Sequence, residues 1–294
     1  MRRQVDNDPL PEGRFLGIVG LQLVNPVWDM ADALRLQPVE PRLGAHEIAR
    51  ALTDPRKAAT LGRYCEYIDY ELAVAPTVAV GKDAILFAWS FISLLRVRSL
   101  VEILVPAALP CSWSVAVLNR LAAHSCEVDL LEDSPNIRQL EEAEPVKDDD
   151  LAWIVNRLTT FNSLKATSPP YALAVDSLCE HNHQSSFRMA AAMLWSGIEA
   201  LFDIKSEISY RLAIYIATLL EKPGNARYEL FKRVKKEYNT RSRIMHGDST
   251  DPETLRLHVV TTRKLLSRLI CRVTENQGVP KPEEIDGLVL TESP

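Results

Sequence analysis

The stretch "ARYELFKRVKKEYNTRSRIMH", residues 226–246, decides the fold of the second half of this chain. Its apolar side chains recur at steps of four and seven, at Leu230, Val234, Tyr238 and Met245. This spacing predicts a helix that turns one face towards a bundle. Arg241 falls on the same stripe, and its guanidinium needs a partner or a cavity because removing it from water is costly. The stretch therefore predicts a packed helix with a polar end.

The predicted helix ends at a histidine. His246 is followed by Gly247, and a glycine just past the last apolar residue is typical of a helix C-cap. The negative end of a helix favours a protonated imidazole and places its charge change near neutral pH, which suits proton transfer but also suits a purely favourable end charge. Arg241 and His246 lie about 140° apart on an ideal helix. They meet only if the helix opens or if a symmetric dimer brings two copies together.

The sequence around this stretch predicts an antiparallel helical bundle. Pro169-Pro170 and Pro223-Gly224 mark a helix start and a break, and Asp251-Pro252 has the N-cap and first-turn residues of a further helix. Helices of this length joined by short turns form such a bundle. The helical segments are 151–164, 169–181, 187–204, 208–222, 226–246 and 252–273.

The first half mixes short extended segments with helices. Residues 15–24 and 70–80 are rich in β-branched side chains and bounded by Pro, Gly or charge, which favours strands. The apolar segment 84–95 predicts a buried helix, because a membrane span needs roughly 20 apolar residues. Residues 99–106, 111–124 and 126–133 then predict strand, helix and strand, with no glycine-rich phosphate loop between them.

An acidic segment with two prolines, residues 133–150, separates the two halves. The predicted fold class is therefore α+β with two domains, a small N-terminal α/β domain at residues 1–145 and an all-α helical bundle at residues 146–276. Residues 277–294 are rich in Pro and Glu, which predicts a loose C-terminal tail.

The composition predicts a reduced, cytoplasmic protein. Apolar residues make up 47% of the chain, enough for a core, and the formal net charge of −5 confines any contact with nucleic acid to a local patch. The five cysteines are far apart and form no CxxC pair, so neither a disulfide framework nor a zinc ribbon is indicated. The N-terminus lacks the apolar run of an export signal, and we expect no membrane association.

Glu199 is the only ionisable residue between Met189 and Phe202. A lone carboxylate in such a run usually pairs with a cation, for which Arg241 and Arg211 are the candidates. We interpret Glu199 as the residue that positions Arg241, with a direct role in catalysis as the alternative.

A run of basic residues lies in the segment that contains Arg241 and His246, although the chain as a whole is acidic. Such a run can guide a polyanionic substrate, although a solvated helix face is its more common meaning. The residues that would contact such a substrate are Lys232, Arg233, Lys235, Lys236 and Arg243.

The cluster "CEHNH", residues 179–183, offers several metal-ligand types together. A metal site usually also needs ligands elsewhere at a recognisable spacing, and the sequence contains none. We therefore expect a polar turn between helices at this cluster, no metal site and no cofactor.

Three stretches of the second half carry a resemblance to a known family. They are "MLWSGIEALF" (residues 193–202), "ISYRLAIYIATLL" (residues 208–220) and "YNTRSRIMHG" (residues 238–247), the last with an Arg-x4-His signature that ends in His-Gly. Together with the order of the helices, they resemble the HEPN domain family, in particular its Apea-like branch, over about residues 150–271.

The resemblance implies a metal-independent endoribonuclease that acts on RNA as a homodimer, with Arg241 and His246 as catalytic residues in a cleft shared between subunits. It implies a toxin-like or anti-phage defence role, in which the first half senses a trigger or holds the nuclease inactive and an antitoxin or trigger protein is a further partner. Ser242 departs from the pattern, since active members often have Asn, Asp or His at that position.

Two alternatives to the nuclease stay open. The same bundle can serve as a non-catalytic module for dimerisation or for binding a partner protein, with Arg241 and Glu199 as a structural ion pair. It can also bind RNA or a nucleotide without cleaving it. An open, positively charged cleft across a dimer, lined by Arg241 and His246, would favour the nuclease. Burial of both side chains against their own chain would favour the binding module.

Overall fold

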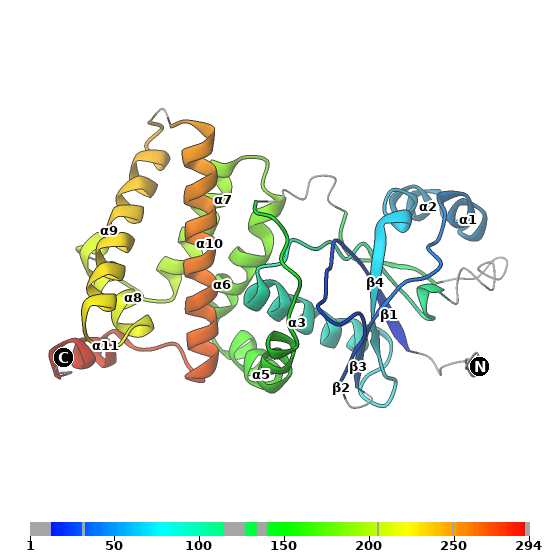
Figure 1. The fold of residues 1–294 in the computed structure, drawn as a ribbon, viewed down its shortest axis with the longest axis horizontal. Coiled ribbons are helices and arrows are strands. Elements are labelled where there is room, and N and C mark those ends of the chain that lie inside the picture. Colours follow the sequence, from blue (N-terminus) through cyan, green and yellow to red (C-terminus); the bar gives the residue numbers. More distant parts are fainter. Residues whose placement is uncertain are drawn as a thin grey trace. The chain divides into compact units, whose positions relative to one another are not determined.

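The computed structural model describes residues 13–30, 33–114, 127–133, 140–204, 206–248 and 250–291. The chain divides into two compact units. Unit 1 comprises residues 1–91, 102–135 and 144–148, and unit 2 comprises residues 92–101, 136–143 and 149–294. A sheet dominates unit 1 and helices dominate unit 2 (Figure 1), in agreement with the expected α+β class. The division differs from the predicted boundary at residue 145, because residues 92–101 and 136–143 belong to the helical unit.

Unit 1 is built on a six-stranded sheet with the strand order β2-β3-β4-β1-β5-β6, and all neighbouring strands are antiparallel. The central pair, β1 and β4, places Phe15 opposite Ala73 and Leu16 opposite Leu72. The strands are β1 (Arg14–Val19), β2 (Trp28–Met30), β3 (Leu34–Pro38), β4 (Ile68–Val74), β5 (Ala107–Leu109) and β6 (Asp129–Leu130). The helices that accompany them are α1 (Ala45–Ala51), α2 (Pro55–Gly62) and the short η1 (Cys65–Tyr67).

The two strands predicted first are present but shorter than expected. β1 ends before Gly20, whose φ of +82° turns the chain, and β4 ends two residues before Pro76. The predicted buried helix is α3 (Gly81–Ser99). The prediction of a strand at residues 99–106 was wrong, since only Leu104 forms a single bridge, to Val19, and β5 begins at Ala107. Most of the helix predicted at residues 111–124 lies outside the described residues.

A buried carboxylate ties the sheet of unit 1 to the segment after β5. Glu71 on β4 accepts hydrogen bonds from Gln37, from the Ser112 hydroxyl at 2.7 Å and from the Trp113 amide at 2.6 Å. Burial raises the pKa of Glu71, while these hydrogen bonds act in the opposite direction. Because both carboxylate oxygens accept hydrogen bonds, we interpret Glu71 as a residue that stabilises the fold.

Unit 2 contains the helices that the sequence predicted, and their starts are the expected ones. Asp251 caps α10 by accepting from the amides of Glu253 and Thr254, with Pro252 in the first turn. α9 and α10 run side by side in opposite directions (Figure 1). The helices are α5 (Asp148–Thr167), α6 (Pro169–Glu180), the short η2 (His181–His183), α7 (Phe187–Ala200), α8 (Ile208–Leu220), α9 (Asn225–Met245), α10 (Pro252–Glu275) and α11 (Pro282–Thr291).

The prediction of a loose tail at residues 277–294 was wrong for the part that forms α11. Ile285 is buried, and Asp286 accepts a hydrogen bond from the Tyr215 hydroxyl on α8 at 2.7 Å. The buried Ile285, together with this hydrogen bond and an ion pair of Asp286 with Arg211 of α8 at 3.7 Å, docks a short helix that composition alone describes as polar. Among the described residues, no helix has the length and apolar character needed to cross a membrane.

Helices α6 and α7 approach closely at Gly197. A Cβ atom added at Gly197 would lie 2.9 Å from the Cβ of Ser177 and 3.2 Å from the Cα of Ala174, both on α6. This contact matters for function because α7 also carries Glu199 and Trp195. The spacing of α6 and α7 therefore sets the platform on which the candidate site is built.

We expect Gly197→Ala to lower the free energy of unfolding by about 1–3 kcal/mol, because overpacking outweighs the gain in helix propensity. Gly287→Ala is the matched control, since it makes the same change inside α11, where nothing lies within 4 Å of the added Cβ. Thermal unfolding followed by circular dichroism measures both. Equal melting temperatures for Gly197→Ala and the wild type would contradict a close α6–α7 contact.

Candidate functional site

The two ends of α9 are defined by glycines. Gly224 precedes its first turn with a φ of +132°, and Gly247 follows its last turn with a φ of +88°. The amide of Gly247 donates to the carbonyl of Ile244 at 3.3 Å, and the amide of Asp248 donates to the carbonyl of Arg243 at 3.1 Å. The predicted glycine C-cap is therefore confirmed, and His246 is the last residue before it.

A second helix satisfies the last carbonyls of α9. The Arg188 guanidinium, in the first turn of α7, donates to the carbonyl of Ile244 and to the carbonyl of Asp248, the latter at 2.7 Å. A cation at the C-terminal end of a helix also opposes the negative end of its dipole. Arg188 could not be identified from the sequence, because no local pattern connects it to a helix end 56 residues away.

The rotation of α9 about its axis follows from its packing against α7. Tyr238 meets the fully buried ring of Trp195 edge to face, with ring centres 5.4 Å apart. The apolar contact face of α9 is made by Leu230, Val234 and Ile244. The prediction that Met245 belongs to this face was wrong: its side chain is 38% exposed, and Ile244 is buried in its place.

Arg241 turns towards α7 and pairs with Glu199. Its Nη2 lies 3.2 Å from Oε1 of Glu199 and donates a hydrogen bond to Oε2 at 3.4 Å. The two side chains are 26% and 32% exposed, and the guanidinium also lies 5.5 Å from the centre of the Tyr238 ring. Burial and the nearby Glu199 carboxylate raise the pKa of Tyr238. Of the two partners expected for Glu199, the structure selects Arg241, while Arg211 contacts Tyr215.

The pair of Arg241 and Glu199 leaves hydrogen-bonding capacity unused. Within the described part of the chain, Nε of Arg241 and Oε1 of Glu199 are buried and have no hydrogen-bond partner. A guanidinium has five N–H donors, and this one uses a single donor on the carboxylate. The hydrogen bonding of this ion pair is therefore incomplete, and the unpartnered Nε is itself buried.

A series of buried hydrogen bonds connects Trp195, which packs against Tyr238, to two further helices. The Trp195 indole N–H donates to Nε2 of His258 at 3.0 Å, and Nδ1 of His258 lies 2.6 Å from a carboxylate oxygen of Glu237. Since Nε2 accepts, the proton sits on Nδ1 and is donated to Glu237, which makes the imidazole neutral. His258 and Trp195 are also stacked, at 6.1 Å between ring centres. Three helices, α7, α9 and α10, meet in this chain of contacts.

His246 lies apart from Arg241. Its imidazole is exposed at the end of α9 and forms no hydrogen bond with any described residue. α9 ends at Met245 and His246 is its C-cap residue, so the angle of an ideal helix does not extend to His246. Arg241 contacts Glu199 of α7, whereas His246 is exposed, so the two side chains have different surroundings within one chain.

All of the basic residues predicted to bind RNA are exposed, namely Lys232, Arg233, Lys235, Lys236 and Arg243. Their interactions are weak ones at the surface. Lys232 pairs with Glu229 at 2.6 Å, and Arg243 donates to the hydroxyl of Thr240 at 3.4 Å. Exposed ion pairs contribute roughly 0–1 kcal/mol, so these cations remain available to a polyanion.

The "CEHNH" cluster was predicted to be a polar turn between helices, but Cys179 and Glu180 are the last residues of α6 and only His181–His183 form the connecting short helix η2. No group of three or more His, Cys, Asp or Glu residues suited to a metal occurs among the residues that the structure describes. His181 is buried, its Nδ1 lies 2.6 Å from the carbonyl of Leu178, and burial lowers the pKa of His181 to about 4. The nearby charge of Arg263 acts in the same direction.

Comparison with protein-family models, with curated proteins and with solved structures gave no match.

We expect His258→Leu to lower the free energy of unfolding by about 2–4 kcal/mol, because it leaves the buried indole N–H of Trp195 and the carboxylate of Glu237 without a partner. His246→Ala is the matched control, and its exposed imidazole predicts a change within about 0.5 kcal/mol. Urea unfolding of the full chain measures both. A His258→Leu protein as stable as the His246→Ala protein would contradict a stabilising role for the hydrogen bonds that join Trp195, His258 and Glu237.

The lowered pKa of His181 predicts a loss of stability in mild acid. The unfolded histidine takes up its proton near pH 6.5, above the folded value of about 4. The stabilisation is therefore complete above about pH 6.5 and is lost as the pH falls towards about 4, by up to ~3 kcal/mol. His181→Gln should flatten the melting temperature against pH in this window, whereas His183→Gln, on the same turn, should retain the wild-type slope. Equal slopes for both variants would refute the assignment.

Proposed function

We propose that this chain is a metal-independent endoribonuclease of the HEPN type, with Arg241 and His246 as its catalytic residues and a homodimer as its working form. The observation that carries the proposal is an exposed histidine at the end of α9, next to exposed basic side chains, in a chain of net negative charge. The guanidinium of Arg241, whose side chain is 26% exposed, would add a phosphate-binding group on the same helix.

The reaction follows from the chemistry of RNA. The 2′-hydroxyl attacks the adjacent phosphorus, the bond to the 5′-oxygen breaks, and the product carries a 2′,3′-cyclic phosphate. His246 takes the proton of the 2′-hydroxyl or donates one to the leaving 5′-oxygen. Arg241 holds the phosphate oxygens as negative charge develops on them. Glu199 orients Arg241 through their ion pair.

The dimer is part of the proposal because of the geometry of α9. Arg241 and His246 face different directions in one chain. A two-fold axis places the His246 of one copy opposite the Arg241 of the other, and it supplies two imidazoles, one for each proton. The biological setting that goes with this activity is cytoplasmic RNA cutting in a toxin-like or anti-phage response. Unit 1 would then act as the sensor or restraint, and an antitoxin or a trigger protein would be a further partner.

The test is cleavage of a mixed RNA by the full chain in excess EDTA. We expect Arg241→Ala and His246→Ala each to lower the cleavage rate by about 10²–10⁴-fold, because each removes a group that acts in the transition state. Glu199→Gln should lower it less, since the amide oxygen still accepts from Arg241. His46→Ala and Arg56→Ala, both exposed in unit 1, are the matched controls and should cleave at the wild-type rate. Cleavage that survives in both motif variants would exclude this site.

A non-catalytic binding module is the second candidate, and the ion pair itself favours it. Arg241 and Glu199 satisfy each other's charge within one chain, as a structural pair does. In that case Arg241→Ala leaves a half-buried carboxylate unpaired and lowers stability, while His246→Ala changes nothing. Absence of cleavage by the wild type across diverse RNAs, together with this stability pattern, would select the binding module.

A further inference from the structure

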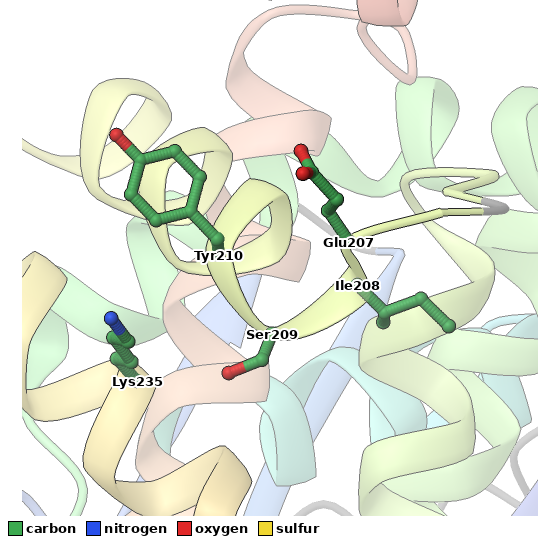
Figure 2. A pocket seen from close by; sticks show the side chains of 5 residues that line it. All are labelled: Glu207, Ile208, Ser209, Tyr210 and Lys235. Carbon is green, nitrogen blue, oxygen red and sulfur yellow. The ribbon is translucent and has the colours of Figure 1, made fainter.

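An open pocket of about 540 Å³ lies where the start of α8 meets α9. Figure 2 shows its lining, in which Tyr210 and Lys235 lie on the same side and Ile208 extends away from them. The Lys235 ammonium is 5.8 Å from the centre of the Tyr210 ring. The Tyr210 ring meets Phe231 edge to face, with ring centres 5.5 Å apart. The pocket therefore combines an aromatic surface with an exposed positive charge.

The Tyr210 ring is available to a ligand. Its side chain is 50% exposed even though Phe231 supports it from α9. A tyrosine held by one aromatic neighbour loses little conformational freedom when a flat ring packs on it. Tyr210 thus offers a preformed stacking surface.

A second pair of a tyrosine and a lysine lies nearer the start of α9. The Lys232 ammonium is 4.7 Å from the centre of the Tyr228 ring, and Tyr228 is 58% exposed. Lys232 also pairs with Glu229, but an ion pair exposed on both sides is weak enough for a phosphate to replace it. The two tyrosine–lysine pairs therefore repeat one chemical pattern on neighbouring parts of the surface.

These residues follow one face of α9 towards His246. Steps of four, three and four lead from Tyr228 through Lys232 and Lys235 to Asn239, which is the spacing of a single helical face, and His246 follows at the C-cap of the same helix. The Ser209 hydroxyl donates to Asn239 at 3.5 Å and so connects the pocket to this face. With a rise of 1.5 Å per residue, Lys235 and His246 are about 16 Å apart along the helix.

We propose that Tyr210, Tyr228, Lys232 and Lys235, here named the aromatic–basic strip, bind single-stranded RNA and lead it to His246. The tyrosines stack on unpaired bases and the lysines contact the phosphates. This inference rests on the proposed function and specifies its substrate as an unpaired strand. A duplex keeps its base faces stacked inside, so it would contact the lysines alone.

Charge alone does not select the ligand. Glu207 lines the pocket and Glu229 pairs with Lys232, so the net positive charge of the strip is small. An acidic peptide would gain little from such a surface. Stacking on exposed aromatic faces does not depend on the net charge, and it requires a ligand that carries flat rings as well as phosphates. The strip therefore fits an RNA strand better than an acidic protein segment.

The experiment measures binding separately from cleavage. The full chain carries His246→Ala so that the RNA stays intact, and fluorescence anisotropy reports the Kd for a labelled single-stranded oligoribonucleotide of mixed sequence and for its duplex. We expect the single strand to bind more tightly than the duplex. Tyr210→Ala should raise the Kd for the single strand about tenfold, and Tyr210→Phe should keep it unchanged. Lys235→Gln should raise that Kd about fivefold and make binding less dependent on salt.

The controls lie in unit 1, on residues of matched type and exposure. Tyr67 is 62% exposed and Lys82 is exposed, so Tyr67→Ala and Lys82→Gln should leave the Kd unchanged. A Kd that is insensitive to Tyr210→Ala and Lys235→Gln would overturn the strip, even if the active chain still cleaves RNA. Equally tight binding of the duplex, or binding of poly-glutamate with the same dependence on Tyr210, would overturn the assignment to single-stranded RNA. No binding of any RNA would overturn it as well.

Discussion

The packing of Trp195 against two other helices is the constraint on which the candidate site depends. Its ring is fully buried, lies edge to face with Tyr238 of α9, and donates its indole N–H to His258 of α10. A large ring with one N–H has a single orientation that satisfies both contacts. The indole therefore contributes to the rotation of α9 about its own axis, together with the packing of α9 on α8, where Tyr210 meets Phe231. That rotation decides which side chains of α9 meet protein and which meet water.

The rotation divides the polar residues of α9 into two groups with different physical surroundings. Arg241 lies in the partly water-excluded contact with α7, where its attraction to the Glu199 carboxylate is strong and its position is fixed. His246 and the basic side chains lie in water, where charges are screened and side chains can follow a ligand. A group that holds a phosphate gains from being fixed. A group that moves protons needs access to solvent and substrate.

The helices of unit 2 were predictable because local signals determine them. Pro169, Asp251 and Gly247 begin or end helices through their own backbone preferences, and the structure places them as expected. The contacts between helices were not predictable in the same way. Arg188 reaches the end of α9, and His258 joins Trp195 to Glu237, through contacts that no spacing in the sequence encodes. The short strand β5 was misplaced because its position is set by pairing with β1, more than 90 residues away, and with the two-residue strand β6.

The ion pair between Arg241 and Glu199 does not by itself decide between a nuclease and a binding module. If every N–H donor of the guanidinium were hydrogen-bonded to an acceptor of the protein, Arg241 would be a purely structural cation. A phosphate could then bind only by displacing Glu199. Here a single hydrogen bond joins the two groups, and Nε of Arg241 has no partner among the described residues. Nε is itself buried, so a phosphate would have to reach another edge of the guanidinium, one that the carboxylate leaves uncovered. The proposed nuclease requires such an edge to be open at the surface, whereas the binding module requires only the ion pair.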